Sequence, residues 1–506
     1  MSAPKLAKAV CIWLVAAISA ACAPLEPLEL PPEYTPPPAR ATLWDELGRA
    51  APQDWHVLLN EGPYALDWRL RAIDSATESI NFQTFLWHFD TVGALVLDHL
   101  LRAADRGVRV RILIDDTFLV HEDELLLALA GHPNIEYRVF NPFKRRSGGI
   151  ATRQLLNIAE FGRLDHRMHN KSMVVDNQVA IVGGRNIANE YFGLDEAANF
   201  RDLELLLGGT VVQGISDAFD EYWNNHWSFP IETISHQKAS DEQLAEAKRI
   251  ADGSPHIHEE ESADRRTAKW LEVVQGADTG EALLFTDNPP EKNPKNRNEA
   301  PVQVANELIE LFDNARSEIV IVTAYLIPTP DLEGAVERAV ARGVRVRILT
   351  NSIRSNNHLV AHSAYRNHID TLLEHGAELH EVRIDAADRD RYMLTPIGRK
   401  TLALHAKAQI IDHDKVFIGS ANLDPRSLRM NTEMGFLIQS AEFNRTVRAA
   451  VEDDFSGANA WRLELQDNGQ VIWVSDDTTL ESQPADSFMQ RIEDWFFSSL
   501  PIEAEL

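Results

Sequence analysis

The sequence reads His169-Asn170-Lys171-Ser172-Met173-Val174-Val175-Asp176 in one place and His405-Ala406-Lys407-Ala408-Gln409-Ile410-Ile411-Asp412 in another. Both stretches follow the pattern H-x-K-x4-D. At equal distance downstream, each is followed by a stretch with the pattern G-x-x-N: Gly183-Gly184-Arg185-Asn186 in the first copy and Gly419-Ser420-Ala421-Asn422 in the second. A single copy would be a weak signal, since three fixed positions match by chance about once in ten thousand starts. Two copies with the same downstream spacing indicate two copies of one structural unit.

The two patterns belong to a larger internal repeat. The stretch Arg106–Leu113 reappears as Arg342–Leu349, so that the numbering shifts by 342 − 106 = 236, and the two histidines show the same shift, 405 − 169 = 236. A repeat of this length indicates a duplicated domain, because the units of solenoid proteins are only about 20–50 residues long. The sequence therefore predicts two related halves, with one site assembled where they meet.

The composition is that of a folded globular protein. The chain has 506 residues, of which 44% are hydrophobic and 25% are charged, and this length gives room for two or more domains. The formal net charge of −28 disfavours general binding to nucleic acid, which needs a basic surface that displaces counterions. The two cysteines, Cys11 and Cys22, both lie close to the N-terminus. We therefore expect no disulfide and no thiolate chemistry in the folded body.

The segment 1–22 is typical of a bacterial export signal. Lys5 and Lys8 precede an apolar run over residues 9–21, which is short for a membrane span. The stretch Ser19-Ala20-Ala21-Cys22 resembles the lipobox of bacterial lipoproteins, with Cys22 as the lipid anchor, although such signals usually have Leu where Ser19 stands. Cleavage without lipidation and an uncleaved anchor helix are the alternatives.

Residues 23–44 are rich in proline and predict an extended, stiff linker. Ala23 after Cys22, in place of Asp, resembles lipoproteins that are sent to an outer membrane, so the export signal predicts a protein exported in a Gram-negative-like bacterium. We expect it to be anchored to a membrane, with the outer membrane as one option, and to face the periplasm.

Each half is predicted to be an α/β unit. In the first half, 79–86 is predicted to be a strand, 93–106 a helix, and 108–115 a second strand near a sheet edge, with its arginines in solvent. A strand hairpin follows, with its turn at 176–178, and 408–418 repeats it in the second half. The predicted fold class is α/β, with two tandem domains, each a mixed β-sheet flanked by helices. The predicted borders are 45–231 for domain 1, 232–266 for a polar linker or excursion, 267–460 for domain 2 and 461–506 for a C-terminal extension.

Strand geometry separates the roles of the motif residues. Side chains alternate along a strand, so His169 and Lys171 share one face, as do His405 and Lys407. Each motif aspartate, Asp176 or Asp412, lies seven positions beyond its histidine, an odd interval at a turn, so we expect it to bind the turn or a backbone amide. The acids that orient the histidines must come from elsewhere. The candidates are Asp202 and Glu433, each of which opens the next apolar strand.

The paired motifs resemble those of the phospholipase D superfamily. Further stretches are similar to bacterial cardiolipin synthases of the exported type: Arg167–Lys171, Gly183–Ile187, Asn189–Gly193, Asp424–Ser427 and Asn431–Gly435. The similarity runs from about residue 72 to about residue 473, most of the chain. One departure is Gly184, where the superfamily motif usually has the serine that Ser420 provides in the second half.

The resemblance implies two pseudo-twofold-related domains with one active site at their interface. Its catalytic motif residues would be His169, Lys171, Asp176, His405, Lys407 and Asp412. By analogy, His169 is the expected nucleophile, forming a phosphohistidine, and His405 the general acid and base, although the sequence alone does not determine this order. The two lysines would hold the phosphate, with Asn186, Asn422 and Ser420 as further ligands. No metal or other cofactor is expected, because the lysines supply the positive charge.

The resemblance further implies a phosphatidyltransferase that makes cardiolipin, with phosphatidylglycerol as acceptor and phosphatidylethanolamine as a candidate donor. A phospholipase D-type hydrolase that releases phosphatidic acid is the main alternative. A nuclease of the same superfamily is disfavoured by the net charge, and a noncatalytic lipid-binding protein would require both motifs to be vestigial. The expected partners are phospholipids and a membrane surface, without nucleic acid, and an unknown protein partner that presents substrate is left open.

Two stretches are candidates for membrane contact. One is Phe140–Arg146, for which a solvated loop is the alternative. The other is Ser487–Leu500, a predicted helix with Phe488, Ile492, Trp495 and Phe496 on one stripe, for which packing on its own domain is the alternative. The pattern His256-Ile257-His258-Glu259 is assigned no metal, because its spacing matches no established site.

Overall fold

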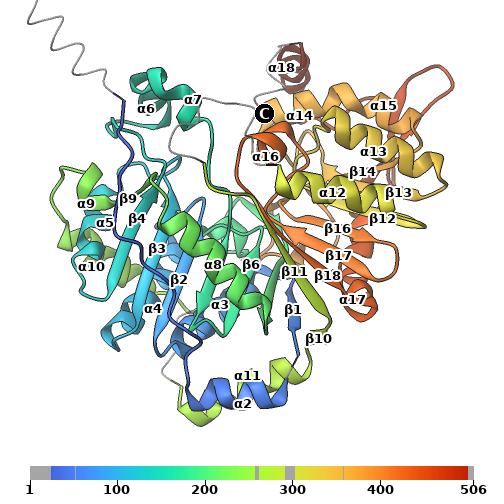
Figure 1. The fold of residues 1–506 in the computed structure, drawn as a ribbon. Coiled ribbons are helices and arrows are strands. Elements are labelled where there is room, and N and C mark those ends of the chain that lie inside the picture. The colour runs from blue at the N-terminus through green and yellow to red at the C-terminus, as the bar shows by residue number, and fades with distance from the viewer. Residues whose placement is uncertain (1–23, 52, 257–260, 291–301, 357, 500–506) are drawn as a thin grey trace, which may run out of the picture.

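Two β-sheets lie side by side, each formed by one half of the chain and covered by helices (Figure 1). The computed structural model describes residues 24–51, 53–256, 261–290, 302–356 and 358–499. Within these residues no helix is both long enough and apolar enough to cross a bilayer. The predicted signal segment, including Cys22, lies outside the described residues, as do His258 and Glu259.

The first sheet is mixed: β2, β3 and β4 run parallel, and β5, β6 and β8 continue it by antiparallel pairing. Its strands, in hydrogen-bonded order, are β10 (Asp278–Thr279), β1 (Trp55–Leu59), β8 (Glu204–Gly208), β6 (Val179–Gly183), β5 (Ser172–Val175), β2 (Ser79–Thr84), β3 (Arg109–Asp115), β4 (Ile135–Phe140) and β9 (Ser228–Pro230).

The second sheet repeats this plan. Its strands, in hydrogen-bonded order, are β11 (Glu281–Thr286), β18 (Met434–Gln439), β17 (Lys415–Gly419), β16 (Lys407–Ile411), β12 (Glu318–Thr323), β13 (Arg345–Asn351), β14 (Glu378–Val382), β19 (Ala460–Leu465), β20 (Val471–Val474) and β21 (Thr479–Leu480). From β1 to β9 and from β11 to β19 the two orders and strand directions correspond. The predicted fold class, with two related α/β halves, is therefore confirmed.

The helices begin at side-chain caps in several places. Asp90 caps the longest helix of the first half by accepting from Gly93 N, and Thr329 caps a helix whose first residue is Pro330. The helices of the first half are α2 (Thr42–Ala50), α3 (Gly62–Ser75), α4 (Thr91–Asp105), α5 (Asp123–Ala130), α6 (Ile150–Leu156), α7 (Phe161–Leu164), α8 (Val211–Trp223), α9 (Ile231–Ile234), α10 (Asp241–Asp252) and α11 (Ala263–Gln275). Those of the second half are α12 (Gln303–Asn314), α13 (Pro330–Ala341), α14 (Leu359–Tyr365), α15 (Ile369–Glu374), α16 (Pro425–Arg429), α17 (Ala441–Glu452) and α18 (Phe488–Ser498).

The two halves share one hydrophobic core where their sheets meet. Val182 and Leu205 of the first sheet are buried in the same cluster as Val322, Ile410 and Ile418 of the second. Strand β17 contacts β6 and β8 across this boundary. Burial of aliphatic side chains contributes about 25 cal/mol per Å² of apolar surface, so the halves are held together as the interior of a single domain would be. This fixed interface can support a site built from both halves.

Three predicted borders differ from the observed ones. The proline-rich segment 23–44 was predicted to be a linker, but from residue 24 its described part lies along the first half: Thr35 N donates to Asp220 and Ala39 N to the Asp176 carbonyl. Residue 267 lies within α11, which packs on α2 and β1 of the first half, so the second half begins at β11. Residue 461 lies within β19, an integral strand of the second sheet.

The polar segment 232–266 also belongs to the first half. Its helix α10 packs on α4 and α5, with Ala247 and Ala251 in the core. The sequence predicts a linker here because α10 buries only a narrow stripe of small residues, so most of this helix is polar.

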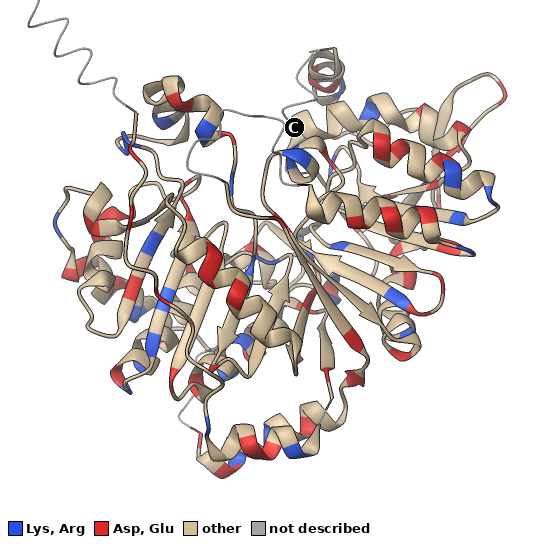
Figure 2. Cartoon of the chain, in the orientation of Figure 1, with Lys and Arg blue, Asp and Glu red and all other residues tan. Residues whose placement is uncertain are grey.

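Strand β3 is central, whereas its alternating basic residues were predicted to face solvent near a sheet edge. It lies between β2 and β4, and its blue residues are visible within the first sheet in Figure 2. Arg111 is buried and pairs with Asp220 of α8 at 2.7 Å, and Arg109 pairs with Glu33 and Glu136. Ion pairs with the N-terminal segment and α8 therefore allow basic residues in a covered strand.

Candidate active site

Two short parallel pairings between the halves bring each motif histidine beside an acid from the other half. β7 (Ala198–Arg201) pairs with β15 (Thr401–Leu404), with Arg201 opposite Leu404, and the next residues are Asp202 and His405. Met168 and Thr432 form an isolated parallel bridge, and the next residues are His169 and Glu433. Parallel neighbours lie about 5 Å apart, so this register determines which acid meets which histidine.

Both histidines are hydrogen-bonded through Nδ1. His169 Nδ1 lies 2.9 Å from both carboxylate oxygens of Glu433, and His405 Nδ1 lies 2.6 Å from Asp202 Oδ2. The two acids are completely buried. An acid bound at Nδ1 holds the proton there and leaves the lone pair on Nε2. Each imidazole therefore offers Nε2 for chemistry.

Aromatic rings fix the planes of the imidazoles. Phe85 meets the ring of His169 edge to face with centroids 4.9 Å apart, and Tyr191 does the same to His405 at 4.9 Å. Sequence reasoning missed both residues. The position of Phe85, directly after the strand β2 that leads to the edge where the motif lies, is the signal that could have found it.

Both motif lysines are buried. Lys171 Nζ donates to the His169 carbonyl oxygen at 2.6 Å, and Lys407 Nζ donates to the His405 carbonyl oxygen. Burial lowers the pKa of Lys171 to about 7, with the positive charge of Lys407 acting in the same direction and Glu433 opposing it. Burial also lowers the pKa of Lys407 to about 8, against the pull of Asp202. Two buried cations beside each other favour binding of an anion.

The imidazoles are neutral in this site. Burial lowers the pKa of His169 to about 4, although Glu433 opposes the shift, and lowers that of His405 to about 3, with Lys407 contributing in the same direction. Burial acts to raise the pKa of Glu433, but His169 and Lys171 keep it below its ordinary value. A neutral imidazole with a free Nε2 lone pair is in the form required of a nucleophile or a base.

Ser420 supports an acid and does not face a ligand. Its hydroxyl is buried, donates to Glu433 Oε2 at 2.5 Å and accepts from Met434 N at 3.0 Å. The prediction that Ser420 binds the substrate phosphate is therefore replaced by a positioning role. At the equivalent Gly184, an added Cβ would lie 2.2 Å from Asp202 Oδ1. Asp202, which is shorter than Glu433, therefore occupies the space that a serine side chain would fill, and this explains why glycine stands at position 184.

The motif aspartates lie in the turns, away from the imidazoles. Asp176 accepts from the backbone N–H groups of Thr77, Glu78 and Ser79 and from Trp44 Nε1. Asp412 accepts from Arg316, Ser317 and Glu318 N in the corresponding place. Asp176 and Asn177 have φ of 54° and 52° in the turn 176–178, which connects Val175 of β5 to its partner Val179 of β6. These acids join the hairpin to the preceding strand.

The two motif asparagines differ in exposure to a ligand. Asn186 Nδ2 donates to Tyr191 Oη at 2.9 Å, and its Oδ1 is buried without a hydrogen-bond partner. Asn422 also has a buried, unpartnered Oδ1, and it lines the cavity beside His169. Buried amides with unused hydrogen-bonding capacity are suited to a polar ligand.

A cavity of about 390 Å³ opens beside His169. Its lining combines aromatic side chains, among them Phe85, Phe118 and Phe161, with polar ones such as Asn422 and Arg426. Phe140 and Phe143, in one stretch predicted to contact membrane, are buried, and Arg146 pairs with Asp116 and Asp123. The aromatic rings and Arg146 of that stretch therefore support the domain and do not contact a membrane.

Among the described residues, His88, Asp90 and Glu190 form the one group placed closely enough to hold a metal ion. Both oxygens of Asp90 already accept backbone N–H groups, from Gly93 and Asn189. The group is therefore a helix cap at the start of α4. It includes neither the histidines nor the lysines of the two motifs.

Comparison with known proteins identifies the family. The family model described as "Cardiolipin synthase, PLD-like domain" matches residues 70–223 and 308–455. The chain is 33% identical over 451 residues to "Cardiolipin synthase C" of Escherichia coli (strain K12), covering 86% of this chain and 92% of that protein. It is 25% identical over 394 residues to "Cardiolipin synthase B" of the same strain, covering 77% of this chain and 78% of the relative.

A solved structure shares the fold. Phosphatidylserine synthase of Haemophilus influenzae superposes with a TM-score of 0.53 at 15% identity, covering 81% of this chain and 89% of that one. The two segments that the family model matches, one in each half, contain the central strands of the two motif-bearing sheets. The chain therefore belongs to the family of cardiolipin synthase, PLD-like domain, and is an enzyme of the phospholipase D superfamily.

Proposed function

We propose that this enzyme transfers phosphatidyl groups between phospholipids through a phosphohistidine, with phosphatidylglycerol as acceptor and cardiolipin as product. The observation that carries the proposal is the crossed pairing of His169 with Glu433 and of His405 with Asp202, beside two buried lysines. The names of the relatives at 33% and 25% identity support the same class of reaction.

The first step forms the covalent intermediate. Nε2 of His169 attacks the phosphorus of a donor phospholipid, a bond forms between nitrogen and phosphorus, and the bond between phosphorus and the headgroup oxygen breaks. The leaving alkoxide takes a proton from His405 Nε2. Lys171 and Lys407 neutralise the charge that builds on the phosphoryl oxygens. The anionic phosphodiester raises the pKa of His405 when it binds, which allows the imidazole to hold that proton.

The second step reverses the first with a different alcohol. The acceptor hydroxyl gives its proton to His405 Nε2, its oxygen attacks phosphorus, and the bond to His169 Nε2 breaks. A glycerol hydroxyl of phosphatidylglycerol gives cardiolipin, and water gives phosphatidic acid. The aromatic side chains that line the cavity favour a lipid acceptor, because transfer requires that water be kept from the intermediate.

His169 is assigned as the nucleophile because it lines the cavity. The group attached to the nucleophile carries two acyl chains, so it needs the adjoining apolar space.

Export to the periplasm and lipidation at Cys22 are part of the proposal and rest on the sequence of the segment 1–22.

The test is lipid mass spectrometry after expression in a bacterium that lacks cardiolipin. The proposal expects cardiolipin from the native chain and none from His169→Ala or His405→Ala. His413→Ala is the matched control, since His413 is an exposed histidine in the turn of the second motif hairpin. A rise in phosphatidic acid without cardiolipin would establish the hydrolase alternative. No change in either lipid would contradict both.

A further inference from the structure

Helix α18 has an inverted distribution of polar and apolar residues. Its acid Asp494 is buried, and it accepts from His362 Nδ1 and Ser363 Oγ, each at 2.9 Å, both on α14. Its outward side chains include Met489 and Trp495, which are 59% and 61% exposed. A surface helix in water has the opposite arrangement. The helix is therefore attached to the protein by polar contacts and presents apolar groups outward.

The segment from α6 to α7 shows the same inversion. Arg153 is buried and donates to the Leu119 carbonyl oxygen at 2.6 Å. Leu155, Ile158 and Phe161 are 69%, 67% and 51% exposed. Two elements that lie far apart in the sequence, in different halves of the chain, thus expose large apolar side chains while a charged residue of each, Arg153 or Asp494, is buried.

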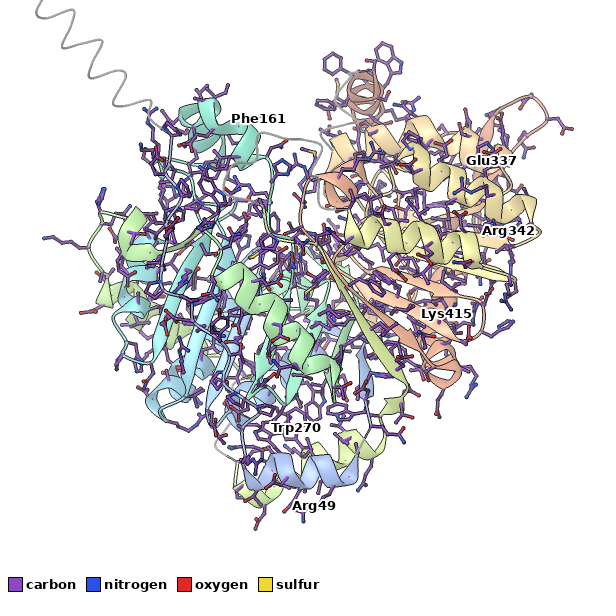
Figure 3. The ribbon with its side chains drawn as sticks, in the orientation of Figure 1. Arg49, Phe161, Trp270, Glu337, Arg342 and Lys415 are labelled. Atoms are coloured by element: carbon purple, nitrogen blue, oxygen red, sulfur yellow. The ribbon has the colours of Figure 1, made fainter. Side chains whose placement is uncertain are left out.

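Both elements lie at one end of the molecule, on either side of the active-site cavity. Figure 1 shows α6, α7 and α18 together at the top of the view, and Figure 3 shows Phe161 at that end and Trp270 at the opposite one. The cavity is lined by Phe161 and Leu164 of α7 in the first half and by His358 and Ala361 at the start of α14 in the second, and α18 packs on α14. The two apolar elements therefore flank the opening that leads to His169.

The described chain begins at the same face. Leu25 N donates to Glu160 Oε2 at 3.0 Å, and Lys144 Nζ donates to the Pro24 carbonyl oxygen at 3.2 Å. Glu160 lies between Ile158 and Phe161 in sequence. Cys22, the predicted lipid attachment point, is two positions before Pro24. A lipid on Cys22 would therefore hold this face, and no other, close to a bilayer.

From these four observations we propose that α18 and the α6–α7 segment form a two-part membrane-docking surface, whose apolar side chains enter the bilayer on either side of the cavity opening. The occupant is a phospholipid bilayer, and the inference rests on the proposed function in that the substrate is drawn from it. Trp and Phe at the boundary between headgroups and acyl chains stabilise such docking. Phospholipid can then reach His169 past the aromatic side chains that line the cavity without crossing water.

The first experiment measures insertion directly. The variants Ile158→Cys and Trp495→Cys of the full chain, each with one added cysteine, are labelled with an environment-sensitive fluorophore and reconstituted in vesicles of phosphatidylglycerol and phosphatidylethanolamine. The labelled parent chain corrects for the native cysteines. Tyr64→Cys is the matched control, because Tyr64 is 40% exposed and contacts Trp68, which packs on Trp270 at the far end. Lipid-attached nitroxide should quench the labels at 158 and 495 several-fold more than at 64.

The second experiment separates docking from chemistry. The double variant Ile158→Ser/Trp495→Ser should lose about tenfold of its transfer rate on vesicles and none on short-chain phosphatidylglycerol dissolved as monomers. Tyr64→Ser should retain both rates. Equal quenching at all three labels, or an equal loss on both substrates, overturns the docking surface.

The outcomes also separate this inference from the proposed function. If the native chain makes cardiolipin while neither label is quenched, the docking surface alone is wrong. If both labels are quenched but the native chain transfers no phosphatidyl group, the docking surface stands and the proposed function fails.

Discussion

Asp202 lies 2.6 Å from His405, although 203 positions separate them and they belong to different halves of the chain. The corresponding contact of His169 with Glu433 crosses the same interface in the other direction. Each half thus supplies one imidazole and the acid that orients the imidazole of its partner half. Neither half is a complete site by itself, so catalysis depends on the packed interface between the two sheets.

Neutralising one of these acids should affect the reaction much more than the fold. In Asp202→Asn, the amide can donate to His405 Nδ1 and so stabilise the wrong tautomer. We expect kcat to fall at least about 100-fold with little change in thermal stability. Asp414→Asn, at an exposed acid in the hairpin turn, is the control. A kcat within a few-fold of the native value would show that the carboxylate does not orient His405.

Adding a side chain at Gly184 should displace Asp202. In Gly184→Ala the new Cβ meets Asp202 Oδ1 at 2.2 Å, so we expect a lower kcat and a lower melting temperature. Ser420→Ala, in the equivalent position, removes the hydrogen bond to Glu433 and the one from Met434 N without displacing the acid, and should cost about 2 kcal/mol. Gly48→Ala, with open space around it, controls for the added methyl group. Equal behaviour of the Gly184 and Ser420 variants would contradict this account.

The two motif aspartates should matter for stability more than for chemistry. Asp176→Ala leaves several buried donors without an acceptor, including Trp44 Nε1 and Ser79 N, and should lower the free energy of unfolding by about 3 kcal/mol. Asp412→Ala should cost about 1 kcal/mol, because the N–H groups it binds are closer to solvent. Denaturant unfolding measures the difference. If folded protein of either variant has lost all activity, the purely structural role is wrong.

The buried lysines should give activity and stability opposite dependences on pH. The pKa of Lys171 is lowered to about 7 and that of Lys407 to about 8 from an ordinary value of 10.5. Phosphate binding needs both ammonium groups, so kcat/KM should fall as pH rises through 7 to 8. The unfolded chain binds more protons between these values and 10.5, so these two groups should increase the free energy of unfolding over that range.

Lys171→Arg tests the assignment of this pH dependence. A guanidinium stays protonated over the whole range, so in the remaining activity the decline should move to higher pH. Kinetics from pH 6 to 10, with parallel denaturant unfolding, measure both effects. A kcat/KM that is constant from pH 6 to 9 in the native enzyme would contradict the lowered lysine pKa values.

Much of the fold could be read from local patterns. The strand and helix positions around Ser79, Thr91 and Arg109 follow from apolar periodicity, which depends on residues close in sequence. Periodicity says nothing of strand order, so Arg111 was expected to be solvated near an edge, whereas Asp220 pairs with it inside the protein. Residues 232–266 were predicted to be a linker for a different reason. The buried stripe on α10 is narrow, so its apolar periodicity is a weak signal of a packed helix.

The sequence by itself determined that this protein has two related halves, that each carries one imidazole and one ammonium group, and that Asp202 and Glu433 are available acids. These features are properties of spacing and residue type, which the covalent chain carries unchanged into any fold. Only the tertiary structure decided which acid serves which histidine, that Ser420 supports Glu433, and that α6 and α18 expose apolar side chains at one end. Those outcomes depend on contacts between distant segments, whose register is set by the packing of the two sheets against each other.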